Sequence, residues 1–349
     1  MWYKLFRLYV KLGLYFTHKN IKVYGKENIP KDGPTIFIGN HQNALIDAIL
    51  IPTTNSREIH FLSRASAFKN KTVSTFLHSL NMIPVYRMRD GRNSMAKNID
   101  VFKQCFEILN DEKAVQIFAE GEHHLKRSII PLKKGFTRII LGTLQKYPHL
   151  NIKIVPVGLN YDTRLGFPSS ATVYYGKPID ANGYFNLEKP DLTYNSILKK
   201  VSSELKKLTT HIDDDENYDQ TLASLKSFGI DFLNPIEANE KITEIKKLDL
   251  KPLISKPVNH INWFTPIHLI TKLNSLLPLL IWQFLKTKIN DTIFTNTYRF
   301  ALIATVFPLF YLIQTLVVSY LFNSKIAVIY FVATIILGII TKSTLKINR

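Results

Sequence analysis

Between residues 21 and 180, short apolar runs alternate with longer stretches in which apolar residues recur every three or four positions. The longer stretches predict helices near 43–51, 65–80, 94–110 and 136–146. The short runs predict strands, which are IKVYG, TIFIGN, EIHFLS, MIPVY, AVQIF, IKIVPVGLN and ATVYYGKPI. Apolar strands that alternate with helices predict an α/β domain, a mostly parallel sheet flanked by helices. In such sheets, chemistry gathers where a strand ends and the next helix begins.

The first twenty residues predict a different element. Lys4, Arg7 and Lys11 recur every three or four positions and share one helical face, whereas most other positions are apolar or aromatic. A basic amphipathic helix of this kind fits a membrane surface, and an ordinary helix packed on its own domain is the alternative. The charges interrupt the apolar run and no A-x-A site follows, so the segment does not read as a signal peptide.

The end of the chain predicts a transmembrane helical hairpin. Residues 300–322 carry no charge and are long enough to cross a hydrocarbon core of about 30 Å. Residues 326–340 are also uncharged, but they are short for a full span and could be re-entrant. A buried helical hairpin in a soluble core is the alternative. Basic residues concentrate outside the two runs, which places both ends and the bulk of the chain on the cytoplasmic face of a membrane.

The segment between the α/β region and the hairpin is helical in character. Residues 217–258 are charged, and the apolar run 264–285 contains Lys272 and two prolines, which favours an interfacial or core helix over a third span. The expected division of the chain is an amphipathic membrane-contact helix at 1–20, the α/β domain at 21–180, a helical extension at 181–260, an interfacial or core helix region at 261–298 and the hairpin at 299–349.

Charge and cysteine content narrow the function classes. The formal net charge is +18, from 45 basic and 27 acidic residues, so anionic partners are expected: lipid headgroups, phosphorylated small molecules or nucleic acid. Nucleic acid is the weakest of these, because the basic residues are spread out and no recognition motif is present. The single cysteine, Cys105, excludes an internal disulfide framework.

His41 and Asp47 are the first candidates for chemistry. They lie six positions apart between an apolar strand and an apolar helix. Six steps on one straight helix would separate them by about 120° around its axis. They meet if His41 lies in the strand-to-helix turn and Asp47 points back from the helix, which is the geometry of an oriented general base. A satisfied core histidine and a capping aspartate are the alternative.

Two further loops carry charge at predicted strand ends. Arg87 follows MIPVY, and the planar guanidinium suits phosphate recognition, although a solvated basic loop is the commoner case. Glu120 and Gly121 follow AVQIF. Lys133 and Lys134 precede a predicted helix start, where an anion would be stabilised. The acidic and histidine residues at 120–124 lack metal-ligand spacing, so we expect no metal site.

Together these stretches resemble the glycerolipid acyltransferases of the 1-acylglycerol-3-phosphate acyltransferase family. That family has four ordered blocks. The block N-H-x4-D resembles Asn40–Asp47, G-x-[IV]-[FP]-[IV]-x-R resembles Asn81–Arg87, F-P-E-G-[TS] resembles Phe118–Glu122, and [VI]-[VI]-P-[VI] resembles Ile154–Val157. The resemblance covers roughly residues 20–180. No single block is specific, but four blocks in order at ordinary spacing are strong evidence.

The departures from these blocks are informative. Five residues, not four, separate His41 from Asp47, and this form looks like the branch that contains yeast-type glycerol-3-phosphate acyltransferases. Ala119 replaces a proline, Glu122 replaces a threonine or serine, and Asn81 replaces a glycine. These changes leave the base in place and bear on the choice of acceptor.

The resemblance implies an O-acyltransferase of phospholipid biosynthesis. It would move a fatty acyl group from an acyl thioester, on coenzyme A or acyl carrier protein, to a hydroxyl of lysophosphatidate or glycerol 3-phosphate. It implies that His41 is the general base and Asp47 its orienter, that Arg87 holds the acceptor phosphate, and that Glu120 and Gly121 shape that pocket. No cofactor is expected beyond the thioester, and membrane lipids are expected partners. A non-catalytic membrane protein that binds anionic lipids is the alternative.

Overall fold

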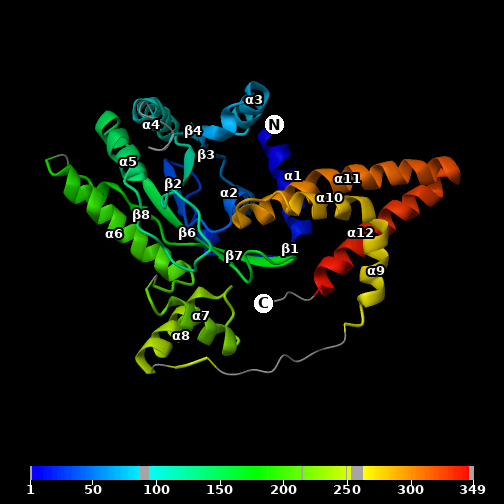
Figure 1. Ribbon diagram of the computed structural model, residues 1–349. Helices are drawn as coiled ribbons and strands as arrows, with labels where there is room; N and C mark the ends of the chain where they lie inside the picture. The colour runs from blue at the N-terminus through cyan, green and yellow to red at the C-terminus, as the bar shows by residue number, and fades with distance from the viewer. Residues whose placement is uncertain are drawn as a thin grey trace.

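The structure, a computed structural model, describes residues 2–86, 94–186, 188–213, 215–248, 250–252 and 262–345. At its centre lies an eight-stranded sheet in the order β1-β7-β6-β2-β5-β3-β4, with β8 beside β6 (Figure 1). The strands are β1 His18–Tyr24, β2 Thr35–Gly39, β3 Ile59–Arg64, β4 Met82–Val85, β5 Ala114–Phe118, β6 Lys153–Tyr161, β7 Ser169–Tyr175 and β8 Ile179–Asp180. Among these pairs only β6–β7 and β6–β8 are antiparallel, so the predicted mostly parallel sheet is confirmed.

One predicted strand divides in two. The run ATVYYGKPI forms β7 and β8, which pair with opposite ends of β6. At the break, the amide of Gly176 donates to the carbonyl of Pro156 at 2.8 Å, and Pro178 has no N–H to donate to a ladder. The strand that the apolar pattern predicts as continuous is therefore broken between Tyr175 and Ile179, a segment that contains Pro178.

Helices cover both faces of the sheet. Helices α4 Ser94–Asn110, α5 Gly135–Lys146 and α6 Pro190–Leu208 pack on one face, whereas α1 Trp2–Thr17, α2 Ala44–Thr54 and the start of α11 Thr295–Leu321 pack on the other. The alternation along β2 shows why: Ile36 and Ile38 enter the first core, and Phe37 enters the second. All three side chains are fully buried, and burying each contributes roughly 1.5–3 kcal/mol.

Three other helices lie at the margins of this α/β unit. Helix α3 Lys71–Ser79 lies between β3 and β4, and α7 Tyr218–Ser227 packs on α8 Pro235–Leu248 around a small core of their own.

Helix α1 exposes apolar side chains, among them Trp2, Leu5, Leu8 and Leu12. Its Arg7 donates to carbonyl oxygens at the end of α2.

The C-terminal helices extend away from the sheet (Figure 1). Helix α11 and helix α12 Ser324–Thr344 pack side by side as the predicted hairpin. The apolar stretches Thr292–Leu321 and Ser324–Thr344 are long enough to cross a membrane, and few of their side chains are buried. Exposed apolar surface of this extent is typical of helices that associate with a membrane.

The apolar run 264–285 forms two helices rather than one. Helix α9 Thr265–Asn274 lies along α12, and α10 Leu276–Lys286 lies along α11. The break falls at Ser275, because Pro278 cannot donate to the carbonyl of Asn274 and its ring would clash there. Gln314 Nε2 of α11 donates to that carbonyl instead, at 3.3 Å.

Candidate active site

The turn between β2 and α2 brings His41 and Asp47 together. Strand β2 ends at Gly39 and α2 begins at Ala44, so His41 precedes the helix and Asp47 lies in its first turn. Ala44 has a φ of 41°, a left-handed value that costs a non-glycine residue of order 1–3 kcal/mol. The result is a hydrogen bond of 3.0 Å between His41 Nδ1 and Asp47 Oδ2.

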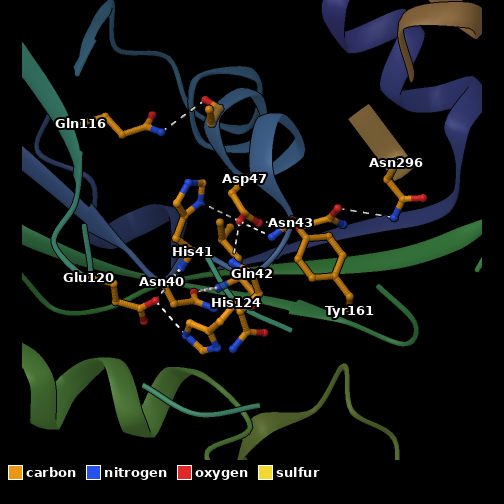
Figure 2. A network of polar contacts seen from close by, with 12 residues as sticks. Asn40, His41, Gln42, Asn43, Asp47, Gln116, Glu120, His124, Tyr161 and Asn296 are labelled. Carbon is orange, nitrogen blue, oxygen red and sulfur yellow. Dashed lines mark hydrogen bonds and ion pairs between the residues drawn. The ribbon is translucent and has the colours of Figure 1, made fainter. Parts of the chain in front are cut away.

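Asp47 is fully buried and its hydrogen bonds reach both carboxylate oxygens. The backbone amides of Gln42 and Asn43 donate to Oδ2 at 2.7 and 2.6 Å, and the hydroxyl of Tyr161 donates to Oδ1 at 2.5 Å (Figure 2). Burial and the Asp47 carboxylate raise the pKa of Tyr161 well above its usual range, so the phenol keeps its proton and remains a donor. These bonds hold the Asp47 carboxylate in one position beside His41.

The imidazole of His41 is held from several sides. Its ring stacks on Phe118 at 4.2 Å between ring centroids, and His123 meets its edge at 5.5 Å. Because Nδ1 is bound to Asp47, Nε2 is the ring nitrogen without a hydrogen-bond partner among the described residues. The side chain is 17% exposed, so that nitrogen is accessible without being fully solvated.

Strand pairing places Glu120 on the other side of His41. Strands β2 and β5 are parallel and Gly39 pairs with Phe118, so His41 and Glu120 each lie two residues past matched strand ends. Glu120 Oε2 accepts from the amide of His41 at 3.4 Å and from His124 Nε2 at 3.1 Å. Oε1 is buried and unbonded within the described part of the chain. Burial raises the pKa of the Glu120 carboxyl, and the bond from His124 opposes that shift.

Gly121 turns the chain towards the lysines. Its φ of 74° lies in the left-handed region, and a Cβ there would approach Lys133 Cγ to 3.1 Å. Lys133 lines the same cavity as His41. Lys134 is directed elsewhere, towards Asp191 at 3.8 Å and the ring of Tyr194. The structure therefore brings His41, Asp47, Glu120, Gly121 and Lys133 together and separates Lys134 from them.

A cavity of about 590 Å³ opens beside His41. Its lining includes the apolar side chains of Leu62, Met82, Val85, Phe102, Ile117, Phe136 and Ile139. It also includes the polar or charged side chains of Ser63, Arg64, Ser66, Glu122, His123 and Lys133. A lining of this composition, with His41 in it, suits a molecule that has both apolar and anionic groups.

Sequence reasoning missed several of these residues. Arg64 ends β3 and lines the cavity, Phe118 stacks on His41, and Tyr161 reaches Asp47 from the end of β6. The strand-end rule that found Glu120 also points to Arg64 and Tyr161 as candidates, since each directly follows a predicted strand. Arg87 lies outside the described residues. Within the described ranges, no three His, Cys, Asp or Glu side chains are placed to hold one metal ion.

Several known proteins are similar to this chain. Residues 20–160 match the family model described as Acyltransferase. The chain is 32% identical to glycerol-3-phosphate O-acyltransferase 2 of Saccharomyces cerevisiae over 56% of its own length and 41% of that enzyme's. It is 28% identical to the 1-acyl-sn-glycerol-3-phosphate acyltransferase of Borreliella burgdorferi, over 57% of this chain and 78% of that one. The chain thus spans less than half the length of the yeast relative.

A solved structure resembles the chain more distantly. The 1-acyl-sn-glycerophosphate acyltransferase PlsC from Thermotoga maritima shares 22% identity with a TM-score of 0.43, over 58% of this chain and 79% of that chain. At this identity and TM-score, the likeness assigns no role to any residue of the site.

Proposed function

We propose, from the premise that residues 20–160 belong to the acyltransferase family, that this chain transfers a fatty acyl group from an acyl thioester to a hydroxyl of a phosphorylated glycerol. One observation carries the proposal. His41 Nδ1 is bound to a buried carboxylate that hydrogen bonds from both sides fix in place, while Nε2 lies on the wall of a part-apolar, part-cationic cavity. That arrangement suits a base that acts on a hydroxyl of an amphipathic molecule.

The reaction follows from the two nitrogens of His41. Nε2 removes the proton from the acceptor hydroxyl, and the oxygen forms a bond to the thioester carbonyl carbon. The carbon–sulfur bond then breaks, and the leaving thiolate takes the proton back from the imidazolium. Asp47 keeps Nδ1 protonated and stabilises the positive charge while it exists. General-base assistance of this kind contributes roughly 10²–10⁴-fold to a rate.

The acceptor phosphate would bind to the basic side chains of the cavity lining. Arg64 and Lys133 supply positive charge there, and Arg87 remains the candidate that the sequence contributes. Arginine and lysine bind phosphate oxygens through charge-assisted hydrogen bonds.

Glu120 is fully buried, and the cavity is lined by its neighbours Ala119, Gly121 and Glu122 rather than by Glu120 itself. We propose that its free Oε1 accepts from a glycerol hydroxyl that reaches past these neighbours, since its other oxygen is already bonded. The apolar side chains of the lining would contact acyl carbons.

The membrane supports the same reaction. We infer that α11 and α12 span a bilayer with the α/β domain on the cytoplasmic side. Lys286 and Lys288 precede α11, Arg299 lies in its first turns and Lys342 lies at the end of α12, whereas Lys325 alone lies at the turn between the two helices. The donor is an acyl thioester of coenzyme A or of acyl carrier protein, and the product of acylation is a lipid. A site at the base of a membrane hairpin can receive such lipids directly.

An acceptor panel tests the proposal. Purified protein in detergent is given labelled acyl-CoA, or acyl carrier protein charged with the same chain, together with glycerol 3-phosphate, lysophosphatidate or another lyso-lipid. We expect transfer to at least one acceptor, and loss of that transfer in His41→Ala at an unchanged melting temperature. Transfer that persists in His41→Ala would contradict the base assignment. A wild type that binds anionic liposomes but transfers nothing would favour a non-catalytic lipid-binding protein.

A further inference from the structure

The base of helix α11 is built into the α/β domain. Asn296 Nδ2 donates to the carbonyl of Arg164 at 2.7 Å and lies 3.4 Å from Asn43 Oδ1, in the turn that carries His41 (Figure 2). Phe300, one turn further on, is buried in the core of the second sheet face and touches Gly13 of α1. The first turns of this membrane helix therefore have a fixed position relative to the site.

The segment just before α11 reaches His123. The ring of Phe294, in the short helix η5 Thr292–Phe294, meets the His123 ring edge-on at 5.0 Å. Asp291 Oδ2 lies 3.7 Å from His123 Nε2, while Oδ1 accepts from the amide of Ile293 at 3.1 Å and caps η5. An aromatic contact and a carboxylate from one segment thus hold one imidazole.

His123 in turn contacts His41. The two rings meet edge-on at 5.5 Å, and both residues line the cavity together with Phe294. Phe294 lies more than 130 residues beyond the end of the region that matches the family model. The cavity wall next to the reacting nitrogen is therefore completed from outside that region.

We propose that Asp291 and Phe294, at the base of the membrane hairpin, are positioning residues that hold His123 against His41 and so complete the active site. The proposal rests on the proposed function, and it adds a contribution from the membrane anchor. Truncating Phe294 would open the cavity beside His41 and free the His123 ring to rotate. The substrate hydroxyl would then be held less closely to Nε2, and displacements of about 1 Å in such sites can slow a reaction by up to about 10²-fold.

A double-mutant cycle tests this link. We expect Phe294→Ala and His123→Ala each to lower kcat/KM by about tenfold, and the double variant to be no slower than the slower single variant, because one acts through the other. Phe294→Tyr keeps the ring and should restore the rate. Phe284→Ala is the matched control, since Phe284 is exposed on α10, and it should leave kcat/KM unchanged. Additive losses, or a Phe294→Ala enzyme as fast as wild type, would overturn the proposal.

A second measurement does not depend on activity. In protein with ¹³C-labelled histidine, the His123 ring resonance is assigned by its loss in His123→Ala. Phe294→Ala should move that resonance, because the ring current of the phenyl group is removed, whereas Phe284→Ala should not. An unmoved resonance would overturn the contact itself. If Phe294→Ala moves the resonance but the wild-type protein shows no acyl transfer, the contact stands and the proposed function is overturned instead.

Asp291→Asn removes the charge at this position but keeps the hydrogen bond that caps η5. Asn at this position still accepts from the amide of Ile293 but no longer attracts His123. Because the carboxylate is 57% exposed, we expect Asp291→Asn to lower kcat/KM by only about two- to threefold. A loss that persists in the His123→Ala background would contradict a route through His123.

Discussion

Two buried carboxylates lie on either side of His41, and they differ in how their oxygens are used. Asp47 accepts hydrogen bonds on both oxygens, from the His41 ring, two backbone amides and Tyr161. Glu120 accepts on Oε2 alone, and Oε1 is buried and unbonded within the described residues. Both side chains are fully buried, so exposure does not explain the difference.

The difference shows that the protein itself supplies hydrogen bonds to both oxygens of Asp47 but to only one oxygen of Glu120. Leaving a buried acceptor unpaired costs about 1–3 kcal/mol, and burial raises the pKa of Glu120 accordingly. Asp47 has no such unpaired oxygen and acts as a fixed partner of the base. We infer that Glu120 is kept incomplete because a substrate hydroxyl supplies the missing bond. Three substitutions test whether the two carboxylates have these different roles.

The largest effect is expected from Asp47→Asn. The amide is neutral and cannot stabilise the imidazolium, and its NH₂ group would face either a backbone amide or the Tyr161 hydroxyl. We expect kcat/KM to fall by roughly 10²–10⁴-fold, measured as acyl transfer to the acceptor that wild type uses. Asp180→Asn is the matched control, because Asp180 lies on the surface and pairs with Lys153, and it should be neutral. A rate within threefold of wild type in Asp47→Asn would remove the orienting role.

A smaller effect on activity is expected from Glu120→Gln. The amide oxygen can still accept from the His41 amide, but the NH₂ group replaces the free carboxylate oxygen that would bind the acceptor. We expect the acceptor KM to rise about tenfold with little change in kcat. Glu107→Gln, on the exposed face of α4, is the control. An unchanged acceptor KM would place Glu120 outside the acceptor site.

The same substitution has a pH signature in stability. The Glu120 pKa is raised above its ordinary value of 4.5, so the folded state holds its proton more tightly than the unfolded state does. That contribution to stability is fully present below about pH 4.5 and is lost as pH rises through the raised pKa. Melting temperatures of wild type should therefore decline across this window relative to those of Glu120→Gln. Parallel curves for the two proteins would contradict a destabilised carboxylate.

The smallest effect is expected from Tyr161→Phe. The change removes the only donor to Asp47 Oδ1 in the described chain and leaves that oxygen buried without a partner. We expect a loss of about 1–3 kcal/mol in the free energy of unfolding, measured by denaturant titration, and a several-fold lower kcat. Tyr174→Phe also removes one hydroxyl hydrogen bond, to Leu233 at the sheet margin, and should leave kcat unchanged. Equal kcat values in the two variants would mean that Tyr161 only supports the fold.

Much of the sheet and half of the site follow from the sequence. The apolar runs locate the strands, and the parallel register then forces His41 and Glu120 together at matched strand ends. Tyr161 follows a predicted strand, but its contact with Asp47 depends on β6 running four residues past the end of β2, and no pattern in the sequence reports that overhang. Phe294 was not found for a similar reason, since its contact depends on how a distant helix docks. Pro278 is the sequence signal for the helix break at Ser275, although the apolar run 264–285 alone predicts one continuous helix.

The assignment of His41 as the base and Asp47 as its orienter is tested most directly by comparing rates of acyl transfer. The rate of the His41→Ala, Asp47→Asn double variant is compared with the rates of the two single variants. If Asp47 serves only to orient and stabilise His41, the double variant is no slower than His41→Ala alone, and each variant is slower than wild type by roughly 10²–10⁴-fold. Losses that multiply, or transfer that survives in His41→Ala, would contradict a single base with its orienter.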